Sequence, residues 1–300
     1  MSESPAKRQA SFTSPLTYRP FGSADVHAAH ALSSSIQWPH RLEDWEFAAG
    51  VGLGFVAEER GRLVGTALCW KFGVDRATIG MVIVAPEQQG RGIGRNLMKM
   101  LLEELSERTI FLYATPAGQP LYEKLGFRVC GSLDKHQGVV AEPPTFVLPH
   151  GELLRKFRSD DLPKVIEIAS LAAGLDRSTV IPALLQIADS IVLEREGQVL
   201  GFSLFRKFGR VHAIGPVVAL NSVDNVRAKV LITYWLNAHK GTPVRIDVPT
   251  EAALTVWLSG IGLAREDHVI KMICNAAENA DSSSLASPFE AYSIINQAMA

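Results

Sequence analysis

The sequence has few of the features that mark secreted, membrane-spanning or metal-bound proteins. Its 300 residues include only three cysteines, Cys69, Cys130 and Cys274, which are far apart and form no Cys-x-x-Cys pair. We therefore expect neither a disulfide framework nor a metal site. No apolar run approaches the roughly 18 residues that a transmembrane helix needs, and the polar start, residues 1–10, does not resemble a signal peptide. These absences predict a cytoplasmic protein without a membrane partner.

Charge of one sign is also lacking. The 30 basic and 31 acidic residues give a formal net charge of −1. No bulk field therefore favours nucleic acid or an anionic surface as a partner. The hydrophobic fraction of 47% is enough to build real cores, and 300 residues suggest two domains at about 100–200 residues each. An oligomer stays possible.

The sequence contains an internal repeat. Residues 55–65 resemble residues 191–201, and Gly65 and Gly201 are 136 positions apart (201 − 65). Lys71-Phe72-Gly73 recurs as Lys207-Phe208-Gly209 at the same offset, and two later pairs of segments follow at offsets of 135 and 133. Matches in the same order predict a duplicated domain.

Each half has the same order of expected elements. Ser23 and Ser159 each precede an apolar stretch and are candidate helix N-caps. A hairpin with a glycine turn follows, then a buried strand, a helix and another strand. This order predicts an α/β fold with a mixed (α+β) sheet. We expect a mobile tail at 1–15, domains at 16–145 and 150–277, and a linker with a terminal helix at 278–300.

Three glycines mark the join between a strand and a helix. The apolar run 80–85 ends at Pro86, and Gly90, Gly92 and Gly94 precede a helix with an apolar stripe at Ile93, Leu97, Leu101 and Leu105. The first turn of a helix has unpaired N–H groups and a positive dipole end. Glycines let the backbone wrap closely round an anion there. The pattern predicts a phosphate cradle.

The spacing separates this loop from two common phosphate loops. A P-loop would need Gly-Lys-Ser/Thr, and a dinucleotide fingerprint would need its third glycine one position later. The pattern Gln89-x-x-Gly92-x-Gly94, preceded by Val84-x-Pro86, instead resembles motif A of the GNAT superfamily of N-acetyltransferases. A glycine-rich turn that binds nothing is the structural alternative.

A second segment resembles the same family. Residues 116–127, with the core Leu-Tyr-Glu-Lys-Leu-Gly-Phe at 121–127, are similar to GNAT motif B. The resemblance implies acetyl-CoA as co-substrate, a carbonyl polarised by a backbone N–H of Ile83 or Val84, and Tyr122 as the acid that protonates the leaving thiolate. The residues that it implies for cofactor binding are Val82, Ile83, Val84, Gln89, Gly90, Arg91, Gly92, Ile93, Gly94 and Arg95.

The acceptor half of the site is less clearly marked. The strand at 79–84 carries no carboxylate that could serve as a base. The segment 38–45 lies where the family shapes its acceptor site, and aromatic, histidine and acidic side chains together suit an amine. They could equally be a loop histidine and solvated helix charges. The candidates are Trp38, His40, Glu43, Asp44 and Trp45, with Asp176, His212 and Asp247 as weaker ones in the second half.

The second half departs from the motif. Residues 215–219 take the strand position, but 220–225 contain no glutamine and no glycine, and Asp224 would repel a phosphate. The resemblance therefore indicates two tandem GNAT-like domains, of which the second is degenerate and is not expected to hold CoA.

We expect an acyl-CoA-dependent N-acetyltransferase that transfers acetyl directly to a primary amine, and we expect this amine to belong to a small molecule. An acyl-CoA sensor without turnover and a protein amino-group acetyltransferase are the alternatives. The sequence gives neither the acceptor, the acyl-chain preference nor the general base.

Overall fold

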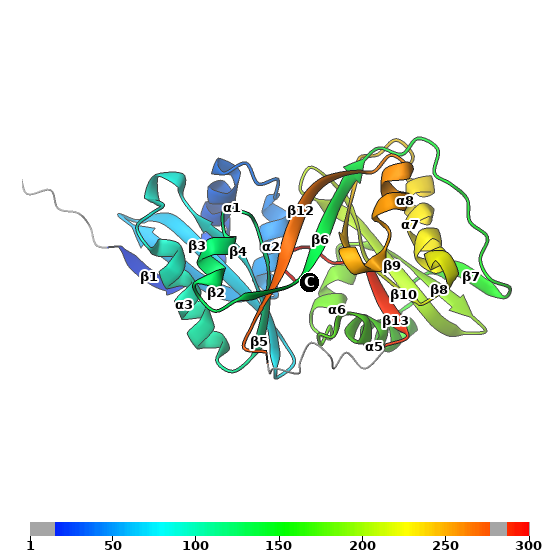
Figure 1. Ribbon diagram of the computed structural model, residues 1–300, viewed down its shortest axis with the longest axis horizontal. Helices are drawn as coiled ribbons and strands as arrows, with labels where there is room; N and C mark the ends of the chain where they lie inside the picture. Colours follow the sequence, from blue (N-terminus) through cyan, green and yellow to red (C-terminus); the bar gives the residue numbers. More distant parts are fainter. Residues whose placement is uncertain (1–15, 277–286, 300) are drawn as a thin grey trace, which may run out of the picture.

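The computed structural model describes residues 16–276 and 287–299 (Figure 1). The expected mobile tail, 1–15, and most of the expected linker lie outside the described residues. The first half of the chain contains β1 (Thr17–Pro20), α1 (Val26–Ser35), α2 (Leu42–Gly50), β2 (Leu53–Glu59), β3 (Arg62–Phe72), β4 (Arg76–Val84), α3 (Ile93–Leu105), β5 (Thr109–Ala114), α4 (Gln119–Glu123) and β6 (Arg128–Gly138).

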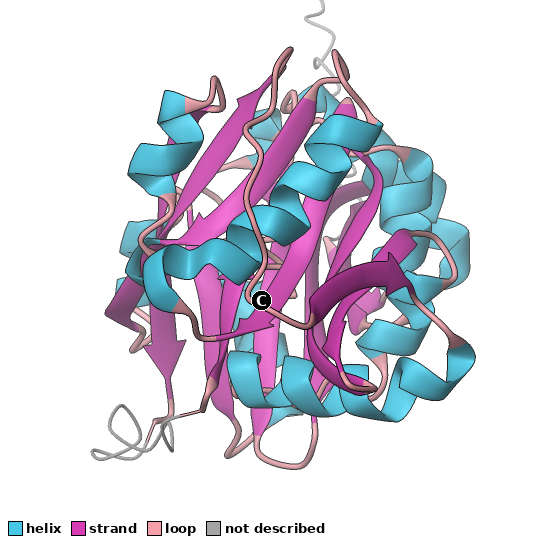
Figure 2. Ribbon diagram, turned by 90° about the vertical axis from the view of Figure 1, so that its right-hand side faces the viewer, coloured by secondary structure: helices cyan, strands magenta, loops and turns pink. Residues whose placement is uncertain are grey.

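The second half repeats this order, as the sequence predicts. It contains β7 (Glu152–Lys156), α5 (Leu162–Ala173), α6 (Val180–Leu185), β8 (Asp189–Arg195), β9 (Gln198–Phe208), β10 (Val211–Leu220), α7 (Val226–Ala238), β11 (Val244–Pro249), α8 (Thr255–Gly260) and β12 (Ala264–Cys274). One further strand, β13 (Phe289–Ser293), follows. The mixed α/β fold is confirmed, and helices lie against the strands of this half (Figure 2).

An ion-pair cluster recurs in both halves. Arg19 pairs with Asp25 at 2.7 Å and with Glu58 at 2.9 Å. At 136 positions further along (155 − 19), Arg155 pairs with Asp161 at 2.6 Å and with Glu194 at 2.5 Å. Because all three members recur at one offset, the cluster supports the duplication that the sequence predicts.

The same aspartates begin the first helices, which corrects the expected caps. Backbone N–H groups of Gly22 and Arg158 donate to Asp25 and Asp161 at 2.9 and 2.7 Å. Ser23 only starts a short 3-10 turn, as does its counterpart in the second half. The aspartate caps the helix in place of the serine because its carboxylate can accept the backbone hydrogen bond and pair with the arginine at the same time.

The two halves exchange one strand each. The sheet order is β1-β2-β3-β4-β5-β12-β6-β11-β10-β9-β8-β7, so β12 of the second half lies beside β5, and β6 of the first half lies beside β11. Figure 1 shows β6 in green and β12 in orange at the centre of the molecule. The exchange joins the two half-sheets into one and places residues of both halves around the middle.

The two central parallel strands of the first half separate. β4 pairs with β5 only from Arg76↔Thr109 to Ile79↔Leu112. A bulge follows, where Met81 has φ 52° and Met81 and Val82 lie opposite Ala67 of β3. Beyond Ile79, the β5-facing edge of β4 has no strand partner among the described residues.

In the second half, the corresponding edge of β10 is paired with another strand. β10 pairs with β11 only at His212↔Val244 and Ala213↔Arg245, and β13 then pairs with β10 from Val217 to Leu220. The sequence predicts a terminal helix in this region, and that prediction is wrong: residues 289–293 form a strand. The exposed edge of β10 is the reason, because its unpaired backbone groups recruit the segment as a strand.

Candidate functional site

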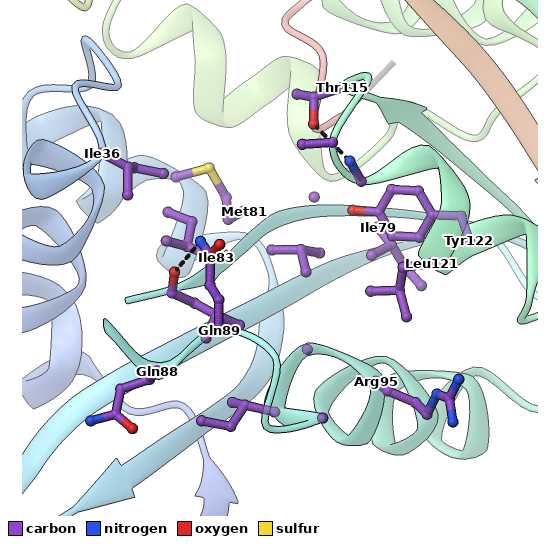
Figure 3. Close-up of a pocket in the computed structure, with 18 of the residues that line it drawn as sticks. Ile36, Ile79, Met81, Ile83, Gln88, Gln89, Arg95, Thr115, Leu121 and Tyr122 are labelled. Carbon is purple, nitrogen blue, oxygen red and sulfur yellow. Dashed lines mark hydrogen bonds between the residues drawn. The ribbon is translucent and has the colours of Figure 1, made fainter. Parts of the chain in front are cut away.

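A cavity of about 820 Å³ lies along the open edge of β4, between the starts of α3 and α4 (Figure 3). The separation of β4 from β5 creates it. Helix α3 is held in place by its apolar stripe, since Ile93, Leu97, Leu101 and Leu105 are all buried in the core, as expected.

The glycine loop forms one end of this cavity. Gly90 and Gly92 have φ angles of 77° and 80°, which favour glycine, and Gly92 is the N-cap of α3. A Cβ atom at either position would meet no protein atom within 4 Å. The space beside the loop is therefore open to a ligand, and the unpaired N–H groups of the helix start suit an anion.

The two arginines of the loop differ. The Arg91 guanidinium pairs with Glu59 at 2.9 Å and also bonds Gln88, and Arg91 does not line the cavity. Arg95 lies on the first turn of α3 and lines the cavity, and its guanidinium makes no hydrogen bond with a described residue. Of these two arginines, Arg95 alone lines the cavity. Of the ten predicted cofactor-binding residues, all except Arg91 line the cavity: Val82, Ile83, Val84, Gln89, Gly90, Gly92, Ile93, Gly94 and Arg95.

Tyr122 closes the other end of the cavity. Its ring packs edge-to-face on Phe127 at 6.0 Å, and Figure 3 shows its hydroxyl pointing into the cavity. The hydroxyl makes no hydrogen bond with a described residue, and burial raises the pKa of Tyr122 to about 12. A Cβ at Gly118 would lie 3.0 Å from the ring, so a glycine there leaves room for the tyrosine. At neutral pH this residue is a protonated donor.

A second pocket, of about 250 Å³, adjoins the first. Trp38, Gly80, Met81, Tyr113 and Thr115 line both. Of the acceptor candidates, Trp38, His40 and Asp44 line this pocket. Other polar and aromatic lining residues carry no signal in the sequence. They come from the exchanged strands, the second half and the C-terminal segment: Lys135, Phe208, Arg245, Asp267, Asn296 and Gln297.

His40 lies in an aromatic cage in this pocket. Its ring contacts Trp38, Trp45 and Phe208, with centroids 5.5, 6.4 and 5.9 Å away. Burial lowers the pKa of His40 to about 4, so the imidazole is neutral at pH 7. Nδ1 is buried and has no hydrogen-bond partner. A neutral ring with an uncommitted nitrogen is able to exchange a proton with a ligand.

The other acidic and basic lining groups are committed to partners. Asp44 accepts from Arg41 at 2.9 Å and from the Gly209 N–H at 2.8 Å. Lys135 pairs with Glu266 at 3.3 Å, and Arg245 pairs with Asp247 at 2.6 Å. The Asp267 carboxylate accepts from the His268 backbone N–H at 2.9 Å.

The structure does not bring the remaining candidates to the pocket. Glu43 is exposed and lies 3.8 Å from Arg41, and Trp45 is fully buried, with its indole N–H donating to Ser33 at 3.0 Å. Trp45 contacts the His40 ring from the core and does not line the pocket. Asp176 is exposed, and neither His212 nor Asp247 lines either cavity.

Two buried arginines of the second half hold the C-terminal segment, residues 295–299, against the pocket. Arg177 donates to the Met299 carbonyl at 2.5 Å, and Arg206 donates to the Ile295 carbonyl at 2.7 Å. From the first half, Thr78 donates to Ala298 at 2.7 Å. No sequence signal points to this wall, because it depends on contacts more than 85 positions apart.

The second half offers no matching cradle. Where the glycine loop would be, Asp224 and Asn225 have φ angles of 53° and 55°, and β13 covers the edge of β10 that corresponds to the open edge of β4. Among the described residues, no cluster of three His, Cys, Asp or Glu side chains is placed to hold a metal ion. No described helix is long and apolar enough to cross a membrane.

Both halves match models of known protein families. Residues 24–127 match the model described as "Acetyltransferase (GNAT) family", and residues 165–285 match one described as "Acetyltransferase (GNAT) domain". A curated protein of Bacillus subtilis (strain 168), described as the uncharacterized N-acetyltransferase YitH, is 34% identical over 194 residues. That alignment covers 63% of this chain and 67% of the relative.

Solved structures show the same fold along the chain. A putative acetyltransferase of Pyrococcus horikoshii aligns with a TM-score of 0.76 and 20% identity, covering 98% of this chain and 99% of that one. A tandem GNAT protein from the clavulanic acid biosynthesis pathway aligns with a TM-score of 0.65 and 14% identity, covering 88% and 100%. At these identities the likeness concerns the fold alone.

Proposed function

Because the chain belongs to the GNAT acetyltransferase family, we propose that it transfers acetyl from acetyl-CoA to the primary amine of a small molecule. The cavity beside the glycine loop is the donor site, and the adjoining pocket is the acceptor site. The observation that carries this proposal is their shared wall: Trp38, Met81 and Thr115 line both, so a thioester and an amine entering from either side meet at the bulge of β4.

The donor site offers groups that match both the pyrophosphate and the thioester of acetyl-CoA. The backbone of Gly90 and Gly92 and the Arg95 guanidinium hold the pyrophosphate of acetyl-CoA. The open edge of β4 offers backbone groups to the rest of the donor, and a backbone N–H of Ile83 or Val84 polarises the thioester carbonyl. Such a donor is worth about 3 kcal/mol of barrier lowering.

The transfer requires two proton movements. The amine nitrogen attacks the carbonyl carbon, the C–S bond breaks, and the Tyr122 hydroxyl donates its proton to the departing thiolate. The amine loses a proton to His40, the pocket-lining group that combines a neutral ring with a buried, unpartnered nitrogen. After the transfer, the His40 imidazolium gives its proton to solvent and the Tyr122 tyrosinate takes one from solvent. Both residues are then ready for the next turnover.

The acceptor pocket favours a small molecule over a protein. Its volume is about 250 Å³, and residues of the second half and of the C-terminal segment form part of its wall. An amine carried on a compact body fits such a space, whereas a lysine within a folded protein would need an open surface groove.

The decisive experiment follows release of the CoA thiol from acetyl-CoA with a panel of small amines and a lysine-containing peptide. Thiol release with at least one small amine, and product with the mass of its acetyl derivative, supports the proposal. Acetyl-CoA binding by calorimetry without turnover on any amine would indicate a sensor, and turnover on the peptide alone would indicate a protein acetyltransferase.

A further inference from the structure

A third cavity, of about 330 Å³, is lined mainly by the second half and shares only Tyr113 with the donor cavity and the acceptor pocket. Pro216 and Val218 of β10 line it, and the repeat aligns them with Met81 and Ile83 of β4, which line the donor cavity. In the second half, β13 covers the edge of β10 that corresponds to the open edge of β4, and no phosphate cradle is present. The second half therefore has no donor site. It has kept an internal cavity beside β10.

Lys271 enters this cavity without an acidic partner. It lies on β12, directly opposite Tyr113 of β5, and its Nζ is 5.1 Å from the centre of the Phe111 ring. Its ammonium makes no hydrogen bond or ion pair with a described residue. Lys135, its counterpart 136 positions earlier (271 − 135) on the exchanged strand β6, has Glu266 at 3.3 Å. Burial without such a partner lowers the pKa of Lys271.

Further polar groups face the same space. Tyr113 lines all three cavities, and its hydroxyl has no hydrogen-bond partner among the described residues. Glu251 and Glu290 also line the third cavity, and neither lies within ion-pair distance of Lys271. The Arg177 guanidinium also lines the cavity but is committed to the Met299 carbonyl. The cavity therefore presents one unpaired cation, Lys271, and two acids, which together match a ligand that carries both charges.

Part of the cavity lining is apolar. Ala169, Ala172 and Ala173 of α5 and Ile181 of α6 form it, and small side chains at three positions leave the space open. An aliphatic group packs there and leaves water. The volume of about 330 Å³ accommodates a molecule of a few heavy atoms with its hydrogen-bonding groups.

We propose that this cavity binds a small aliphatic α-amino acid. Its carboxylate lies between Lys271 and the Tyr113 hydroxyl, its ammonium faces Glu251 and Glu290, and its side chain packs on the alanines of α5. Binding occurs without chemistry, because no donor site adjoins the cavity in this half. This site does not depend on the acceptor assigned to the first half.

Calorimetry of the full chain tests the ligand class with three matched probes. L-Leucine carries both charges, 4-methylpentanoate lacks the amine and 3-methylbutylamine lacks the carboxylate. We expect leucine to bind and each analogue to bind at least about tenfold more weakly, because each loses a charge-assisted contact. Absence of leucine binding at millimolar concentration, or equal binding of either analogue, overturns the proposal.

Variants locate the site. Lys271→Met should raise the dissociation constant for leucine at least about tenfold. Lys240→Met, which removes an exposed lysine in the turn after α7, should leave it unchanged. Ala172→Leu fills the apolar end and serves as an independent second variant if Lys271→Met does not fold. Leucine binding that survives both cavity variants, or that is lost in Trp38→Ala instead, overturns the assignment. These readouts need no acetyl transfer, so they stand apart from a failure of the proposed function.

Discussion

Asp44 on α2 accepts a hydrogen bond of 2.8 Å from the backbone N–H of Gly209, 165 positions further along the chain. The same carboxylate accepts from the side chain and backbone of Arg41. Gly209 sits in the turn between β9 and β10 with φ 58°, and a Cβ there would lie 2.9 Å from the Pro39 carbonyl. The segment that carries His40 is thus fixed to the second half at this point.

Removal of this carboxylate should destabilise the whole molecule. Asp44→Ala leaves the buried Gly209 N–H without its acceptor and takes the closest carboxylate from the Arg41 guanidinium, which keeps its bond to the Lys207 carbonyl. We expect this to cost about 2–4 kcal/mol of unfolding free energy. Urea denaturation measures the change. Glu43→Ala removes an exposed neighbour and should change stability by less than about 0.5 kcal/mol. Equal losses in the two variants would show that the Gly209 bond contributes nothing.

The glycine loop allows a matched test of anion binding. Gly92→Ala and Gly61→Ala both place a methyl group at a positive φ, 80° and 72°, and in both the new Cβ meets no atom within 4 Å. Each should cost about 1 kcal/mol of stability through backbone strain. Only Gly92→Ala should also weaken acetyl-CoA binding, by about tenfold or more in calorimetry, because its methyl group enters the cradle. Equal affinities of the two variants for acetyl-CoA would contradict the proposal that the glycine loop binds its pyrophosphate.

Tyr122 should act on turnover more than on binding. Tyr122→Phe keeps the ring against Phe127 and removes the proton that the thiolate takes. We expect kcat to fall about 100-fold or more, with the acetyl-CoA dissociation constant changed by less than about threefold. Tyr234→Phe, on α7 in the second half, is the control. An unchanged kcat in Tyr122→Phe removes this residue from the chemistry.

The sequence points to most of the residues that line the cavity beside the glycine loop and to few of those that line the adjoining pocket, for physical reasons. The glycine loop, the stripe of α3 and Tyr122 are specified locally, by spacing within one strand–helix unit, and the family and the tandem fold that they imply are confirmed. Lys135 and Asp267 reach the acceptor pocket only through the strand exchange. Their strands have the same alternating pattern whichever partner they pair with, so sequence gives no register between distant segments.

His40 should make stability depend on pH in a window of its own. Its folded pKa, about 4, lies below the ordinary 6.5, so the unfolded chain takes up a proton first as the pH falls. The stabilisation is complete above pH 6.5 and is lost between pH 6.5 and 4, by at most about 3 kcal/mol. His40→Asn should flatten the unfolding free energy across this window, as measured by urea titrations at several pH values.

Two comparisons distinguish the effect of His40 from general acid unfolding: a control histidine variant, and the lower pH range in which the carboxylates titrate. His150→Asn changes an exposed histidine and should leave the slope as it is in the unmodified chain. Arginine partners lower the pKa of Asp25 and Asp161 below 3.8, so their stabilisation is lost only at lower pH. A His40→Asn chain with the slope of the unmodified chain would contradict the neutral buried imidazole.

The exchange of β6 and β12 has a consequence for how the chain is made. The N-terminal half cannot complete its sheet as soon as it is made, because the strand that pairs with β5 consists of residues 264–274 and leaves the ribosome only after most of the second half. Until then β5 is an open edge, and β6 has neither of its neighbours, β11 and β12. The nascent first half must therefore wait for the second, and the two halves become native together as one cooperative unit.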